Sequence, residues 1–280
     1  MTMRPLFLAV LLPVVSLVAV APAESQTIDS ADDFDGRETW PLLTPETVEM
    51  DGDRLGWQRS DYAFSLRFQT EEWNEVEAVI DVFPSTFQGR SAHIIQWTTS
   101  QPDGTGAIDA LWIDASDFRV YHRVYRLGGA GEQWAGDYMI HQHHPEGSVH
   151  VLVTDDGEVE RRTASDGRPR FDFATLGFLF GLMELEEGDG YRILNIGVRT
   201  DPAPRELFAK VGPVVDMEDG DGEIRHAREV AVLSPSETQL ITFYVTSEPP
   251  FFLGWDFRRI ESGRIVSRVR ARGAPLTEAF

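Results

Sequence analysis

Four histidines in one short segment have the types and spacing that could do chemistry. The segment MIHQHHPEGSVHVLV, residues 139–153, holds four of the seven histidines of the chain on either side of a turn-forming Pro-Glu-Gly sequence. In one hairpin register, His141 and His143 on the first strand share a face with His150 on the second strand. Three imidazoles with an open fourth position are an arrangement known for catalytic zinc, which lowers the pKa of a bound water to about 7. The sequence thus supplies a hypothesis of a zinc site with these three ligands.

A second register of the same hairpin separates the three histidines. Pro145 at the second turn position favours a type I turn with a bulge at Gly147, which places His150 opposite Gln142. A slip of one residue moves every side chain of a strand to the other face of the sheet. The sequence leaves the register open, and in the second register the hairpin is a solvated, histidine-rich strand pair without a cofactor.

Signals for other catalytic chemistry are weak. The chain contains no cysteine, and it has no Gly-x-Ser-x-Gly sequence of the kind that exposes a nucleophilic serine. We therefore name no catalytic residue and favour a protein that is not an enzyme.

The elements that must position the hairpin are predicted to be β strands. Apolar and polar residues alternate with the period of two that is typical of strands, and turn-forming residues separate the runs. This pattern predicts an all-β fold, an antiparallel meander that forms a barrel or a strongly curved half-barrel. The clearest runs are residues 57–68, 75–83, 118–127, 239–246 and 264–272.

One segment departs from the strand pattern. The sequence FDFATLGFLFGLMELEEGDG, residues 171–190, begins with Asp172 as a helix N-cap. A helix over about 173–183 would be apolar on nearly all sides, which predicts that it is buried. We expect this short helix to close the open side or the mouth of the barrel.

The N-terminal residues have the pattern of an export signal. Arg4 precedes an apolar run over residues 6–21, and Ala-Pro-Ala at 21–23 offers a cleavage site. We predict a signal peptide over 1–23, a linker or loosely docked arm over 24–46 and a single antiparallel β domain over 47–280. The mature protein would be exported to the periplasm or the extracellular medium, without stable membrane insertion after cleavage.

The net charge of the chain limits its partners. The formal net charge is −21 at pH 7. A protein with this charge repels nucleic acid and anionic membrane surfaces. We therefore expect no nucleic-acid partner.

The second part of the chain resembles a known protein family. The resemblance runs from about residue 107 to the C-terminus, through LWIDASDFRVYHRVYRLGG, FATLGFLFGLMELEEGDGYRI, EIRHAREVAVL and TFYVTSEPPFFLGWDFRRIESGRIV. The family consists of secreted or periplasmic bacterial β-rich domains of unknown function. The resemblance implies an envelope protein similar in style to half-barrel carriers of lipids or lipoproteins. It supplies no catalytic residues and does not include the histidine hairpin.

Three functional classes follow from these patterns. The first is a non-enzymatic barrel-like protein that binds a lipid or other apolar or amphipathic molecule, or assists envelope assembly. A continuous apolar cavity would support this class, and a filled interior would contradict it. The second is a zinc-binding protein, hydrolase or lyase that uses the histidine hairpin. The third is a protein-interaction module of the envelope, and an exposed apolar patch would support it. We favour the first class; the identity of the ligand and the oligomeric state do not follow from the sequence.

Overall fold

The computed structural model describes residues 28–67, 72–100, 106–128, 138–144, 147–153, 159–164, 169–196 and 205–277, with only the backbone for 127–164 and Arg205. The predicted signal peptide, residues 1–23, lies outside the described residues. The prediction of an all-β fold is confirmed, because 15 strands form one curved sheet.

The sheet consists of two runs of antiparallel strands joined edge to edge. Strand β15 pairs with β2, so that the second half of the chain lies beside the first. The first run comprises β2 (Gln58–Leu66), β3 (Asn74–Phe87), β4 (Arg90–Ser100), β5 (Gly106–Asp114), β6 (Val120–Gly128), β7 (Tyr138–His144), β8 (Gly147–Val153) and β9 (Val159–Ala164). The second run comprises β10 (Gly190–Asn195), β11 (Arg205–Glu218), β12 (Ile224–Leu233), β13 (Gln239–Val245), β14 (Phe252–Arg259) and β15 (Arg264–Leu276).

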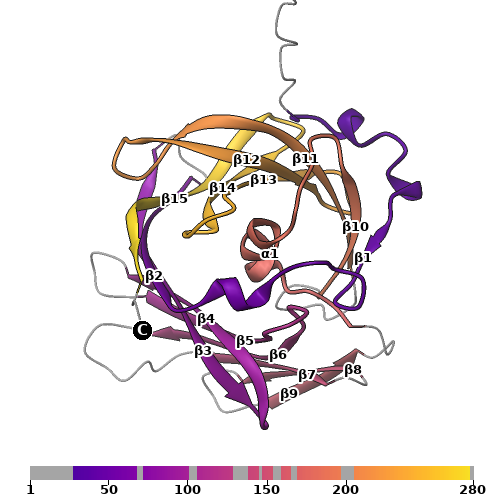
Figure 1. Ribbon diagram of the computed structural model, residues 1–280, viewed down its shortest axis with the longest axis vertical. Helices are drawn as coiled ribbons and strands as arrows, with labels where there is room; N and C mark the ends of the chain where they lie inside the picture. The colour runs from indigo at the N-terminus through magenta and orange to yellow at the C-terminus, as the bar shows by residue number, and fades with distance from the viewer. Residues whose placement is uncertain are drawn as a thin grey trace, which may run out of the picture.

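The sheet curls into a ring of strands around a short helix (Figure 1). The strand order begins at β1 (Leu42–Leu43), which pairs in parallel with β10, and ends at β9. Because the order has two ends, the ring is an open curled sheet. The predicted alternative of a strongly curved half-barrel describes this arrangement better than a closed barrel.

The alternation seen in the sequence corresponds to the two faces of the sheet. On β3, the side chains of Ala78, Ile80 and Val82 are buried in the main apolar core, whereas Glu75 and Glu77 are exposed. Successive residues of a strand point to opposite faces. The apolar set of β3 therefore lines the concave side, and its charged set covers the convex side.

The predicted helix is present inside the ring. It begins as a 3-10 turn, η4 (Phe173–Thr175), and continues as α1 (Leu176–Leu182), all seven residues of which are buried. The Ala174 N–H donates a hydrogen bond to the Asp172 carboxylate at 3.0 Å, so Asp172 caps the helix as predicted. No helix in the described part of the chain is both long and apolar enough to cross a membrane.

The N-terminal segment runs along the outside of the ring, beside β10 and β11 (Figure 1). It contains η1 (Ala31–Phe34) and η2 (Arg37–Thr39) before β1, and η3 (Gly52–Leu55) follows. Ile28 and Phe34 are buried in a second apolar cluster with Leu233 and Leu240. The described part of the predicted arm is therefore packed on the convex face of the sheet.

Candidate functional site

The candidate site is an apolar pocket at one end of the concave face. It has a volume of about 320 Å³ and is lined by eleven described residues, seven of them apolar. Small-molecule sites are typically apolar pockets of about 300–1,000 Å³ with a few polar groups. The lining residues come from η4 and from β10 to β15 with the adjoining turn, and they are Phe173, Asn195, Leu207, Val232, Ser234, Pro235, Gln239, Ile241, Trp255, Phe257 and Ser267.

The apolar wall of the pocket follows from strand alternation. Ile241 and Phe243 of β13 are two residues apart and share a face, as do Trp255 and Phe257 of β14. Phe243 is fully buried in the main core, and Ile241 and Trp255 pack against it. The end of the core that these strands share is therefore open enough to form the pocket, whereas the middle is packed.

The middle of the ring is filled by aromatic side chains and α1. Phe252 stacks on Tyr62 with ring centroids 5.7 Å apart, and it lies 5.7 Å from Trp97 and from Phe178 of α1. The described side chains leave no continuous apolar cavity through this part of the ring, which is the observation that would have supported the ligand-binding class most strongly. The most apolar space beside this core is the pocket at its end, and a more polar pocket of about 710 Å³ lies between Leu43, Leu182 and Tyr191.

A buried ion network fixes the position of Phe173 at the base of the pocket. Arg123 of β6 donates two hydrogen bonds of 2.9 Å to Asp172 and two more, of 2.8 and 2.5 Å, to Asp109 of β5. Asp172 is 2 % exposed and also caps η4. Because a buried charge is tolerated only when it is paired, this network ties the start of the helix to β5 and β6.

The polar groups of the pocket are few and uncharged. The Trp255 indole N–H donates to the Ser267 hydroxyl at 3.3 Å, and both residues line the pocket. The Asn195 side-chain amide donates to the Ile196 carbonyl at 2.7 Å. Asn195 is 4 % exposed, and its Oδ1 has no hydrogen-bond partner among the described residues. A buried acceptor without a partner is costly, which makes Asn195 the unusual polar residue of this wall.

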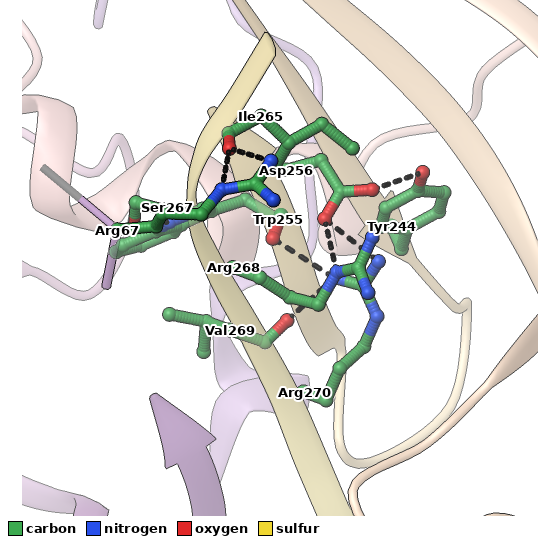
Figure 2. Close-up of polar contacts among 9 residues, drawn as sticks. All are labelled: Arg67, Tyr244, Trp255, Asp256, Ile265, Ser267, Arg268, Val269 and Arg270. Atoms are coloured by element: carbon green, nitrogen blue, oxygen red, sulfur yellow. Dashed lines mark hydrogen bonds and ion pairs between the residues drawn. The ribbon is translucent and has the colours of Figure 1, made fainter. Parts of the chain in front are cut away.

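Asp256 of β14 and Arg268 and Arg270 of β15 form a charged network on the opposite face of the sheet (Figure 2). The Asp256 carboxylate accepts hydrogen bonds from Arg268 at 2.9 Å, from Arg270 at 2.8 Å and from the Tyr244 hydroxyl at 3.2 Å. Burial raises the pKa of Tyr244, and Asp256 beside it raises it further, so this hydroxyl stays protonated and donates. The network clamps β13, β14 and β15 together from the convex side and leaves the pocket side uncharged.

The histidine hairpin adopts one of the two registers considered from the sequence. His141 pairs with His150, and His143 pairs with Ser148, which is the register that the zinc hypothesis requires. Arg123 of β6 is paired with His141 on the other side. The side chains of His141, His143 and His150 lie outside the described residues, so the zinc site stays a prediction. Among the side chains that are described, no three His, Cys, Asp or Glu residues are arranged to hold a metal ion.

Sequence reasoning did not name the residues of the pocket. The strands β13 and β15 lie in predicted runs, but the pocket joins Phe173 to residues between positions 195 and 267 on six strands. The signal that was present is the uninterrupted inward set of Ile241, Phe243 and Val245. That set indicates a buried face, and it does not distinguish a packed core from a cavity.

Comparison with known proteins supports the fold. The chain matches no family model and no curated protein. Among solved structures it is similar to the crystal structure of a β-barrel-like protein of a domain of unknown function, DUF1849, from Brucella abortus, with a TM-score of 0.51 and 12 % sequence identity over 80 % of this chain and 97 % of that chain. At this identity the likeness concerns the fold alone. The protein is therefore similar in architecture to a β-barrel-like domain of unknown function.

Proposed function

We propose that this protein is an exported, non-enzymatic β-barrel-like protein that binds an apolar or amphipathic small molecule in the pocket beside Phe173. The observation that carries the proposal is the pocket itself, a space of about 320 Å³ with a mostly apolar lining. This volume is at the lower end of the usual range for small-molecule sites. It suits a compact ligand or a single alkyl chain better than a whole two-chain lipid.

The location of the protein is part of the proposal. The charged, apolar and small-residue regions of residues 1–23 have the order of a secretory signal. Export would place the mature chain in the periplasm or the extracellular medium, where a carrier for a poorly soluble molecule has a purpose.

The two alternative classes have less support. The hairpin register favours a zinc site, but a register alone does not make a ligand set. A docking module would need an exposed apolar patch. The strongly exposed large apolar residues in the described part of the chain are Val214, Ile224 and Leu276, on three different strands.

Filling the pocket tests the proposal. We expect Ile241→Trp to lower the affinity for the neutral apolar fluorophore phenylnaphthylamine by at least ~10-fold, because the larger ring occupies the ligand space. Gln239→Trp narrows the exposed mouth of the same pocket. Because this position is exposed, the second variant should destabilise the packed core less than Ile241→Trp does. The measurement is a fluorescence titration of the chain without residues 1–23.

A matched control separates pocket filling from a general effect of tryptophan. Ile224 is 61 % exposed on β12, outside the pocket, so Ile224→Trp should leave the titration unchanged. Equal binding by all three variants would show that the fluorophore binds elsewhere. Native mass spectrometry of the gently purified protein adds a second readout, in which a small apolar adduct supports the proposal and a zinc adduct lost in His141→Ala supports the metal alternative.

A further inference from the structure

The lining of the pocket contains no ionisable side chain among the described residues. Its polar members are Asn195, Ser234, Gln239 and Ser267, which are two amides and two hydroxyls. The network around Asp256 lies on the other face of the sheet (Figure 2). Arg259 of β14 pairs with the lining residue Gln239 and is exposed on the pocket's face, outside the lining. A charged group brought to the buried wall beside Asn195 would therefore lose its hydration without meeting an opposite charge among the lining residues.

The penalty for a charged ligand is large. An ion buried without a partner costs several kcal/mol in real proteins. For an anion, the net charge of −21 on the chain adds long-range repulsion. The buried wall of the pocket therefore disfavours a fatty-acid carboxylate relative to an uncharged compound of the same shape.

The hydrogen-bonding groups of the wall select among uncharged ligands. The Asn195 amide N–H₂ is used by the Ile196 carbonyl at 2.7 Å, which fixes the orientation of the amide and leaves Oδ1 as an acceptor without a partner. The Trp255 indole N–H is used by Ser267. Asn195 Oδ1 lacks a donor, and a hydroxyl or an amide N–H of a ligand would supply it.

We infer that the pocket binds neutral amphiphiles with a single alkyl chain, such as an alcohol or a primary amide, and that Asn195 Oδ1 accepts a hydrogen bond from their polar end. The inference rests on the proposed function, since it names the chemical class of the ligand for the same pocket. It assigns Asn195 as a specificity-determining residue.

Displacement of phenylnaphthylamine by four compounds, each with a straight chain of eight carbons, tests the inference at pH 8. Octanamide and octanoate have nearly the same shape and differ in charge, and we expect octanoate to bind at least ~100-fold more weakly. Octanol and methyl octyl ether differ in the hydroxyl proton, and we expect octanol to bind ~2- to ~10-fold more tightly. These comparisons use the wild-type protein and need no variant to fold.

The variant Asn195→Leu removes the proposed acceptor oxygen and so tests its contribution to ligand affinity. It should remove the advantage of octanol over methyl octyl ether and leave the affinity for the ether within ~2-fold of its wild-type value. Asn74→Leu, at an exposed position at the start of β3, makes the same chemical change away from the pocket and should preserve the advantage.

The outcomes distinguish the two proposals. If the fluorophore does not bind in the pocket at all, the proposed function fails. If it binds and octanoate displaces it as well as octanamide does, the pocket is a site for apolar ligands, but the inference of a neutral class is overturned. If octanol keeps its advantage in Asn195→Leu, the assignment of Asn195 is wrong.

Discussion

Glu229 of β12 is a buried carboxyl group on the convex face of the sheet. It is 5 % exposed, and its Oε2 makes no hydrogen bond to any described residue. An added Cβ at Gly212 would lie within 3.5 Å of both Glu229 and Ile28, so the carboxyl is close to the start of the docked arm. Burial raises the pKa of Glu229, Asp256 raises it further, and Arg258 opposes the shift.

This raised pKa gives a stability prediction with a definite sign. The folded state favours the protonated carboxyl, so the contribution of Glu229 to stability is complete below its unfolded pKa of about 4.3 and is lost as the pH rises through its folded pKa. Glu229→Gln keeps a neutral group there at every pH. We expect the variant to be more stable than wild type by about 1–3 kcal/mol at pH 8, with the difference shrinking toward pH 5.

Urea unfolding at several pH values measures this difference. Glu77→Gln on β3 changes an exposed glutamate and should give no pH-dependent gain. A constant difference between Glu229→Gln and wild type across the pH range would contradict the role assigned to ionisation.

At the scale of the element, α1 depends on two glycines for its close approach to the sheet. A Cβ added at Gly177 would lie 2.3 Å from the Phe252 ring, and one added at Gly181 would lie 2.6 Å from the Phe251 carbonyl oxygen. Phe252 cannot retreat easily, because it stacks on Tyr62 and contacts Trp97. The glycines are therefore explained by packing inside the ring.

We predict that Gly177→Ala destabilises the protein although alanine is the better helix former. The gain in helix propensity is about 1 kcal/mol, and overpacking of a core costs about 1–3 kcal/mol, so the expected net loss is up to about 2 kcal/mol. Thermal or urea unfolding gives the value. Adding Phe252→Leu should recover part of the loss by making room, and additive effects of the two substitutions would refute the contact as its cause.

At the scale of the whole molecule, two apolar clusters lie on the two faces of one curled sheet. The concave cluster includes α1 and the pocket wall, and the convex cluster includes Ile28, Phe34, Leu233 and Leu240. The part of the arm before β1 covers the convex cluster, whereas Leu43 of β1 belongs to the concave core. Removal of the arm should therefore uncover the convex cluster and leave the concave core folded.

Removal of the arm tests this division. Compared with a chain that lacks residues 1–23, a chain that lacks residues 1–39 should fold but be less stable by about 3–6 kcal/mol, since it loses the burial of Ile28 and Phe34. The uncovered convex cluster should also promote self-association, measured by sedimentation. Unchanged stability and sedimentation would show that the arm contributes nothing, and complete unfolding would show that the two faces are not separable.

The sequence by itself determined the class of the fold and several of its faces. Alternation over residues 75–83 places Val76, Ala78, Ile80 and Val82 on one face, and the structure buries the last three and half-buries Val76. The apolar run after Asp172 predicted a buried helix, and η4 with α1 fills that range. These features are local, because the side-chain period of a strand or a helix is set by the order of neighbouring residues in the sequence.

Only the tertiary structure decided the features that join distant segments. The pairing of β15 with β2, the Arg123–Asp172 ion pair and the pocket each combine residues far apart in the sequence. The hairpin register was also open, since turn chemistry favoured a bulge and face matching favoured the pairing of His141 with His150 that is present. Local preferences are worth a few tenths to about 1 kcal/mol, so the summed pairing and packing of whole strands decides between them.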